Sequence, residues 1–157
     1  MADTQLLEAE EQLVVFELSR ERYGVEIGRV QEIIRTPAIT RLPRAPEFVE
    51  GIIDLRGKVI PVVDLRRRFG LEHGELGRAG RVVVVDVEGQ IIGIMVDAVS
   101  EVLRVPTGAV EPPSSVVTTL ESSYLRGIAK LDGRLIILLD LDRLLSWDEK
   151  RALQEAT

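Results

Sequence analysis

Few side chains in this sequence have the type and spacing that active-site chemistry requires. The chain of 157 residues contains no cysteine and a single histidine, His73. Disulfides, thiolate metal sites, cysteine nucleophiles and histidine clusters are therefore excluded. His73 lies in a polar loop flanked by glycine, without a second histidine to assist it, so we expect a solvated residue. The sequence predicts neither a bound metal nor a cofactor.

Two aspartates could be taken for a carboxylate pair that performs acid and base catalysis. Asp64 and Asp140 stand at the same place in two similar segments, each directly before a short stretch expected to be helical. An aspartate at that position accepts hydrogen bonds from the free amides of the first helical turn. We therefore expect both residues to be helix caps.

Phosphate binding has two candidate segments. The stretch from Gly51 to Lys58 is faintly similar to a phosphate loop, but five residues separate its glycines, and Val59 stands where a magnesium-binding hydroxyl is needed. The one basic run is Arg66, Arg67 and Arg68. Aromatic platforms for stacking nucleic-acid bases are scarce, so we expect these arginines to lie on a solvated surface.

Composition and charge favour an ordinary globular protein. Hydrophobic residues make up 45% of the chain and charged residues 29%, with a formal net charge of -6. The acidic residues are spread along the chain, so a nucleic-acid footprint is not indicated. The N-terminus lacks a signal-peptide pattern, and no apolar run approaches the roughly 20 residues that span a bilayer. We expect a cytoplasmic, non-enzymatic protein without direct membrane insertion.

The chain contains the same unit twice. YGVEIGRVQEIIRTP, from Tyr23, aligns without gaps with IGIMVDAVSEVLRVP, from Ile92. A second segment, FVEGIIDLRGKVIPVVDLRRRF from Phe48, aligns in the same way with YLRGIAKLDGRLIILLDLDRLL from Tyr124. Because the order of the segments is also repeated, duplication explains the pattern better than chance does.

Each unit is predicted to be rich in β-strands. VVFEL and VVVVDV carry the β-branched residues that suit a buried pleated surface, and later hairpins turn at Arg56-Gly57 and Asp132-Gly133. Roughly five short strands per unit are typical of a small barrel, which removes exposed edges by curling the sheet on itself. We expect an all-β fold of two five-stranded barrels packed side by side, with short helices and a C-terminal helix capped by Ser146.

These segments carry a close resemblance to the CheW family, the coupling proteins of bacterial chemotaxis. It extends from Leu13 to about Leu153 and rests on YGVEIGRVQEIIR, LPRAPEFVEGIIDLRGKVIPVVDLRRRFG, GIMVDAVSEVL and YLRGIAKLDGRLIILLDLDRLL. The barrels that the resemblance implies are SH3-like. Asp54 is a departure, because relatives often carry asparagine before the Leu-Arg-Gly turn.

The resemblance also implies a domain organisation. Residues 13–157 would form a single CheW-like domain of two intertwined barrel subdomains, at approximately 13–80 and 81–145. Strand exchange at the ends of these ranges is left open. Residues 1–12 would be a flexible N-terminus.

The function implied by the resemblance is that of an adaptor. It would bind the cytoplasmic tips of methyl-accepting chemoreceptors and the regulatory domain of the histidine kinase CheA, at receptor arrays on the inner face of the membrane. The receptor would occupy an apolar groove between the barrels with polar partners at its rim. Carried over by position, the receptor-binding residues are Ile27, Val30, Glu32, Ile33, Arg56 and Val99. The kinase would face the second barrel, where no single residues are assigned.

The residues themselves leave alternatives open at this groove. Apolar side chains in IGRVQEII could equally belong to the core. Glu32 recurs as Glu101, and an arginine, Arg35 or Arg104, follows each of them by three positions, so a structural ion pair competes with receptor binding.

A charge difference between the repeats allows two interpretations. Arg56 at the first hairpin tip corresponds to Asp132 at the second. This reversal marks either a division of labour or two turn residues that face water.

Other functions remain compatible with the sequence. A scaffold for a non-motility receptor array and the coupling module of a larger signalling protein share the same fold. A small ligand-binding barrel is a more distant alternative.

Overall fold

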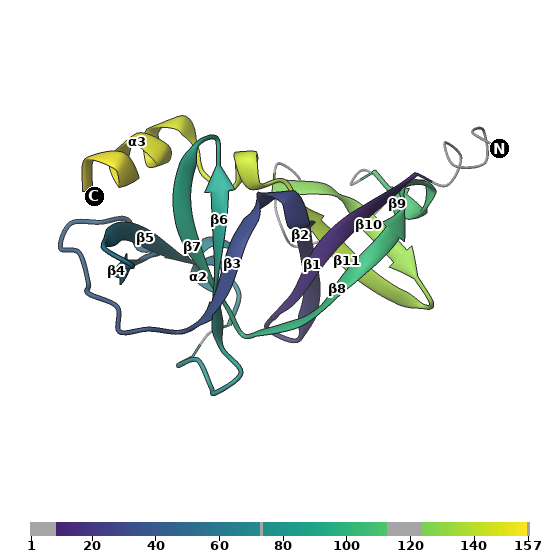
Figure 1. The fold of residues 1–157 in the computed structure, drawn as a ribbon, viewed down its shortest axis with the longest axis horizontal. Helices are drawn as coiled ribbons and strands as arrows, with labels where there is room; N and C mark the ends of the chain where they lie inside the picture. Colours follow the sequence, from purple (N-terminus) through teal and green to yellow (C-terminus); the bar gives the residue numbers. More distant parts are fainter. Residues whose placement is uncertain (1–8, 73, 113–123, 157) are drawn as a thin grey trace.

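The computed structural model describes residues 9–72, 74–112 and 124–156, and its strands form two sheets (Figure 1). Sheet A has six strands in the order β8-β1-β2-β11-β10-β9. Their bounds are Ala98–Pro106 (β8), Glu10–Leu18 (β1), Glu21–Glu26 (β2), Arg134–Leu139 (β11), Leu125–Leu131 (β10) and Val110–Glu111 (β9). Sheet B has five strands in the order β3-β6-β7-β5-β4. Their bounds are Val30–Arg35 (β3), Arg81–Val87 (β6), Gln90–Val96 (β7), Lys58–Asp64 (β5) and Val49–Leu55 (β4).

Helices are few and short. In the part of the chain that the structure describes, they are η1 (Ile27–Arg29), α2 (Leu65–Arg68), η2 (Thr107–Ala109), η5 (Leu141–Arg143) and the C-terminal α3 (Trp147–Ala156). Within the described residues, none of these helices has both the length and the apolar character needed to cross a membrane. The protein is therefore mostly β, as the sequence predicts.

Turn chemistry explains why adjacent strands form hairpins. Four tight hairpin turns lie within the described ranges, and each has two central residues at positive φ, the conformation of a type I′ turn that suits the twist of the strands. These pairs are Ser19-Arg20, Arg56-Gly57, Glu88-Gly89 and Asp132-Gly133. The predicted turns at Arg56 and Asp132 are confirmed. Asp54 stabilises the first of them, because its carboxylate accepts a 2.8 Å hydrogen bond from the Gly57 amide.

The two sheets do not follow the two sequence repeats. The β1–β2 hairpin of the first repeat pairs with β8 and β11 of the second repeat. Reciprocally, the β6–β7 hairpin of the second repeat pairs with β3 and β5 of the first. The ranges 13–80 and 81–145 therefore each supply strands to both sheets, because the chain crosses between sheets after β2 and after β7.

Sheet A starts closer to the N-terminus than the domain predicted from the sequence. Residues 10–12, expected in a flexible N-terminus, belong to β1 because they pair with the C-terminal end of β8. Residues 1–8 of that range lie outside the described residues.

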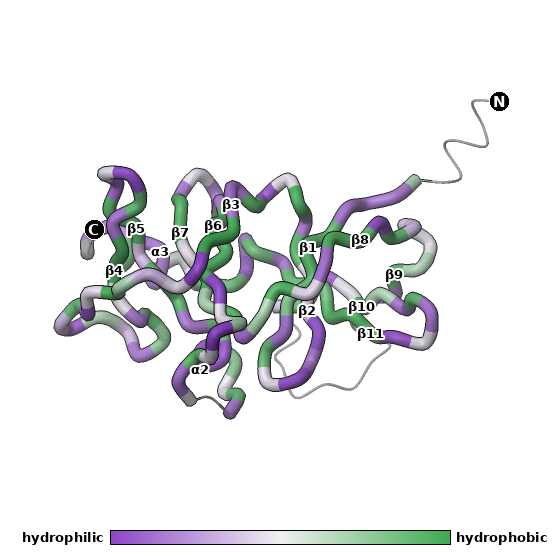
Figure 2. The backbone as a smooth tube through the Cα atoms, turned by 60° about the horizontal axis from the view of Figure 1, so that its bottom comes forward, coloured by the Kyte–Doolittle hydropathy of each residue, from purple (hydrophilic) through white to green (hydrophobic). Residues whose placement is uncertain are grey.

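Three apolar cores hold the sheets in shape. One lies within sheet A around Leu13 and Ile136, and another within sheet B around Val62 and Val84. The largest lies between the sheets and includes Phe16. Successive residues of a strand point to opposite faces, so strands buried on both faces must be continuously apolar. Figure 2 shows these apolar stretches along β6 and β7.

In each sheet an ion pair joins an edge strand to a distant hairpin. In sheet B, Glu32 on β3 pairs with Arg56, which lies at the turn between β4 and β5. In sheet A, Glu101 on β8 pairs with Arg134 at the start of β11, at 3.0 Å. The sheets are thus curled so that β3 approaches the β4–β5 hairpin and β8 approaches the β10–β11 hairpin.

The helix caps predicted from the sequence are confirmed. Asp64 accepts a 3.0 Å hydrogen bond from the Arg66 amide, and Asp140 accepts one of 3.1 Å from the Asp142 amide. Ser146 and Glu149 form a reciprocal capping box at the start of α3, with hydrogen bonds of 3.1 and 2.7 Å. This helix buries Leu153 against the central core.

Tyr23 gives the central core a predicted dependence on pH. Its ring stacks between Phe16 and Phe69, and burial, reinforced by the charge of Glu21, raises the pKa of Tyr23 to about 12. An unfolded tyrosine ionises near pH 10. Between pH 10 and 12 the unfolded state therefore loses this proton while the folded state keeps it, and stability should fall by about 2 to 3 kcal/mol.

Denaturant unfolding of the wild type and Tyr23→Phe across this pH range measures the effect. The free energy of unfolding of Tyr23→Phe should not show the fall that ionisation of Tyr23 in the unfolded state causes between pH 10 and 12. Equal slopes against pH for the two proteins would refute it.

Candidate docking surface

The structure divides the apolar residues predicted to bind a partner. Ile27 in η1 is 37% exposed and Ile33 in β3 is 39% exposed. Val30 and Val99 are half-buried and pack against the central core between the sheets. Of the four apolar residues, two therefore lie at the surface and two contact the core. Val30 of sheet B and Val99 of sheet A meet the same core, so these candidates straddle the junction of the two sheets.

Val102 is a further exposed apolar residue, which the sequence patterns above did not single out. It is 53% exposed on β8 and occupies the repeat position that aligns with Ile33 on β3. The gapless alignment of the repeats could have identified it, because it pairs Val30 with Val99 and hence Ile33 with Val102. We refer to Ile27, Val30, Ile33, Val99 and Val102 as the docking surface.

A second pair of exposed apolar residues also occupies aligned positions in the two repeats. Val59 at the start of β5 is 50% exposed, and its equivalent Leu135 at the start of β11 is 55% exposed. Both follow directly on the hairpin turns whose charges differ, at Arg56 and Asp132.

The two polar residues predicted at the rim lie in contact with each other. Arg56 donates two hydrogen bonds to the Glu32 carboxylate, one of them 2.9 Å long. Arg56 remains 69% exposed and Glu32 25%. Among the ion pairs of the described residues, the alternative partner Arg35 does not appear. Glu32 therefore serves to join the ends of sheet B while presenting Arg56 to solvent.

The arginine run does not form the solvated surface that the sequence predicts. Arg66 is only 4% exposed, because its guanidinium contacts the carboxylates of Asp64 and Asp97. Arg68 lies over the rings of Phe48 and Tyr124, at 4.9 and 5.1 Å from their centroids. These arginines are structural. The segment from Gly51 to Lys58 is likewise a β-hairpin and has no phosphate-loop geometry.

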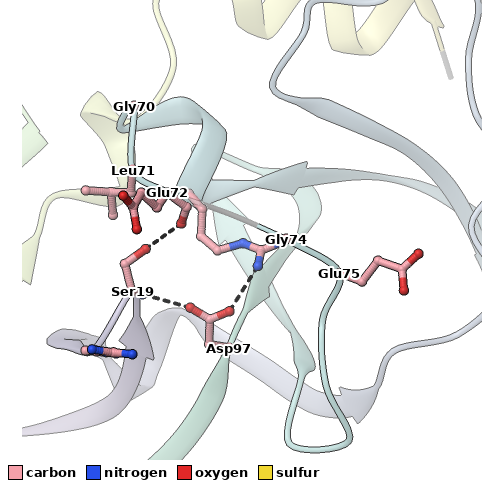
Figure 3. A pocket seen from close by; sticks show the side chains of 9 residues that line it. Ser19, Gly70, Leu71, Glu72, Gly74, Glu75 and Asp97 are labelled. Atoms are coloured by element: carbon pink, nitrogen blue, oxygen red, sulfur yellow. Dashed lines mark hydrogen bonds and ion pairs between the residues drawn. The ribbon is translucent and has the colours of Figure 1, made fainter.

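An open cavity of about 880 Å³ lies beside the buried arginine (Figure 3). Asp97 accepts hydrogen bonds there from the Ser19 amide at 2.8 Å and from Arg66 at 3.1 Å. The Ser19 hydroxyl donates to the Glu72 carbonyl at 2.7 Å. These groups partner one another and join the β1–β2 turn to the segment after α2. His73 lies outside the described residues, among which no group of three or more metal-ligating side chains is found.

Two sheets packed on a shared core define an all-β protein, and comparison with known proteins identifies the family. A family model described as a CheW-like domain matches residues 12–149. The chain is 34% identical over 139 residues to chemotaxis protein CheW of Klebsiella aerogenes, covering 88% of this chain and 84% of the relative. It is 33% identical over 141 residues to chemotaxis protein CheW of Rhizobium meliloti, covering 90% and 91%.

The structure agrees with a solved member of the same group. The scaffolding protein TtCheW from Thermoanaerobacter tengcongensis matches with a TM-score of 0.83 and 41% identity, covering 90% of this chain and 91% of that one. The chain belongs to the CheW-like family, a family of non-catalytic scaffolds. It is a chemotaxis coupling adaptor.

Proposed function

We propose that this adaptor binds the cytoplasmic tip of a methyl-accepting chemoreceptor and the regulatory domain of the histidine kinase CheA at the same time. It would act in the cytoplasm, at receptor arrays on the inner face of the membrane. The observation that carries the proposal is the set of exposed apolar side chains on η1, β3 and β8. Large apolar residues mark an interaction site when they form one exposed patch, which is what the proposal requires of Ile27, Ile33 and Val102.

A receptor helix suits the chemistry of the docking surface. An amphipathic helix presents apolar anchors at intervals of three or four residues, and such anchors dock on apolar surfaces. Burying the remaining exposed part of Ile27, Ile33 and Val102 would contribute about 1 kcal/mol for each side chain. Micromolar affinity corresponds to about -8 kcal/mol, so these residues supply a substantial part of a reversible interaction.

The polar rim adds specificity to this apolar contact. Arg56 is held in place by Glu32 yet remains mostly exposed. A positioned guanidinium can donate a further hydrogen bond to a polar or acidic side chain of the receptor without losing its own partner. The kinase regulatory domain would bind the second barrel, at residues outside the docking surface, so that the receptor and the kinase can bind together.

A binding experiment with both partners tests the proposal. The full chain is mixed with a receptor cytoplasmic fragment and with the CheA regulatory domain, separately and together. We expect each partner to be retained alone and a ternary complex to form with both. Competition between the partners for one site would contradict the adaptor mechanism.

Reversing the charge at Arg56 should weaken receptor binding selectively. We expect Arg56→Asp to raise the Kd for the receptor fragment about 5- to 150-fold, or about 1 to 3 kcal/mol, because a carboxylate at this turn faces Glu32 and repels acidic partners. Folding should persist, because aspartate tolerates the left-handed turn conformation that Arg56 adopts at φ 50.

The matched control is Asp132→Arg, which makes the opposite change at the equivalent turn of the second repeat, also at φ 50. It should leave receptor affinity within about twofold of the wild type. Titration by calorimetry measures both. If Arg56→Asp binds the receptor fragment as tightly as the wild type, Arg56 is not part of the receptor site.

A further inference from the structure

The chain crosses between the two sheets at two equivalent places, and each crossing is held by an ion pair. After β7 the crossing residue is Asp97, which contacts Arg66 at 3.1 Å. After β2 the crossing segment is η1, where Arg29 contacts Asp142 through two hydrogen bonds, one of them 3.3 Å long. Both pairs link a crossing to the short helix that follows the last hairpin of a repeat.

The polarity of these pairs is reversed between the repeats. Arg66 and Asp142 occupy aligned positions, two residues after the cap aspartates Asp64 and Asp140. In the first pair the helix α2 carries the cation, Arg66, and the crossing carries the anion, Asp97. In the second pair η5 carries the anion, Asp142, and the crossing carries the cation, Arg29. An ion pair is thus present at both crossings although each individual charge differs.

Arg29 is the principal anchor of η1. This helix has only three residues, none of which is buried, and no side chain caps its start. A Cβ added at Gly28 would contact nothing within 4 Å. By contrast, Arg29 donates a 3.0 Å hydrogen bond to the Asp86 carbonyl and holds the Asp142 carboxylate. A three-residue segment without a buried side chain or a capped start is expected to open locally when this anchor is lost.

The anchor extends to the C-terminal helix. Lys150 of α3 donates a 2.8 Å hydrogen bond to the Asp142 carbonyl and pairs with Glu88 at 3.0 Å. The hydrogen bonds between Arg29 and Asp142 raise the pKa of the arginine and lower the pKa of the aspartate, so the pair stays ionised at neutral pH. Arg29 is thereby connected to β6, η5 and α3.

We infer that Arg29 and Asp142 are positioning residues, which hold η1 so that Ile27 and Val30 are presented to the receptor helix. Ile27 begins η1, and Val30 follows Arg29 directly. The inference rests on the proposed function, because it concerns the receptor side of the docking surface. Holding these side chains in their bound arrangement lowers the entropy that docking must overcome. The guanidinium of Arg29 is occupied within the protein, so its effect is indirect.

Asp142→Asn tests the inference, because the residue lies on η5 and outside the docking surface. In the full chain, affinity for the receptor fragment should fall about three- to tenfold, and amide exchange of residues 27–30 should accelerate by a similar factor. Exchange in the central strands β1 and β6 should stay at the wild-type rate. Asp148→Asn removes the same charge from an exposed position of α3 and should change neither quantity.

Two further variants separate positioning from a general structural role. Asp142→Glu keeps the carboxylate and should restore affinity and amide protection to near the wild-type level. The double variant Arg29→Gln/Asp142→Asn should bind the receptor fragment about as tightly as the single variant with the lower affinity. The reason is that both substitutions break the same pair, Arg29 with Asp142. Additive losses, or equal losses for Asp142→Glu and Asp142→Asn, would overturn the inference.

The wild-type titration distinguishes this inference from the proposed function. If the wild type does not bind the receptor fragment, the proposed function fails. If the wild type binds it and Asp142→Asn binds equally well, only the positioning role fails.

Discussion

Arg66→Met is expected to lower the free energy of unfolding by about 3 to 5 kcal/mol, the cost typical of breaking a buried ion pair. Arg66 is 4% exposed, and its guanidinium forms two 3.2 Å hydrogen bonds with Asp64, which is 1% exposed. Without the arginine this carboxylate remains buried with no comparable cation. The link from Arg66 to Asp97, which joins α2 to the sheet crossing, is lost as well.

Urea denaturation measures this loss, and the neighbouring arginine provides the control. Arg67 is 38% exposed and lies 3.6 Å or more from its acidic partners. Arg67→Met should therefore cost less than about 1 kcal/mol. Adding Asp64→Asn to Arg66→Met should recover part of the loss, because the uncompensated charge is removed. Equal destabilisation by the two single arginine variants would contradict this account.

Gly51→Ala is expected to cost about 2 to 4 kcal/mol, because no side chain fits at this position of β4. Gly51 has φ 155, and a Cβ would overlap the carbonyl oxygen of Thr40. Thr40 and Ile52 exchange two backbone hydrogen bonds of 2.9 and 2.8 Å here. The register of the β4–β5 hairpin also shifts at this point, so the glycine forms part of a β-bulge.

Thermal and urea unfolding of Gly51→Ala measure this effect. Gly127 is the equivalent glycine of β10, where a Cβ would lie 2.7 Å from the Glu111 carbonyl oxygen, so Gly127→Ala should also destabilise the protein. Gly108 in η2 has open space around it, and Gly108→Ala should change stability by less than about 1 kcal/mol. A Gly51→Ala variant as stable as Gly108→Ala would show that the loop around Thr40 moves away freely.

The elements of this fold were predictable because their signals are local. The Asp132-Gly133 turn and the caps at Asp64 and Ser146 each depend on a few consecutive residues. The exchange of hairpins between the repeats was not predictable, because the β1–β2 hairpin could pair with the strands of either repeat. Pairing of distant strands is decided by the packing of three cores at once, and single-chain periodicity does not report it.

At the candidate site, too, the sequence did not determine which single side chains are exposed and which contact the core. Ile33 and Val30 have the same chemical character in the sequence, yet one is 39% exposed and the other packs against the central core. Sequence also suggested Arg35 as a partner for Glu32, whereas curling of sheet B places Arg56 there. Which residues bind the receptor stays a prediction, to be tested by the titrations described above.

The sequence by itself determined that the chain is duplicated and β-rich, because the repeated segments and the turn signals are written in the order of residues, and its adaptor role entered through the resemblance that these segments carry. Only the tertiary structure decided that the hairpins are exchanged, that Arg66 is buried, and that Arg29 reaches Asp142. These features join residues 31 to 113 positions apart. Their partners are selected by the way two curled sheets pack against a shared core.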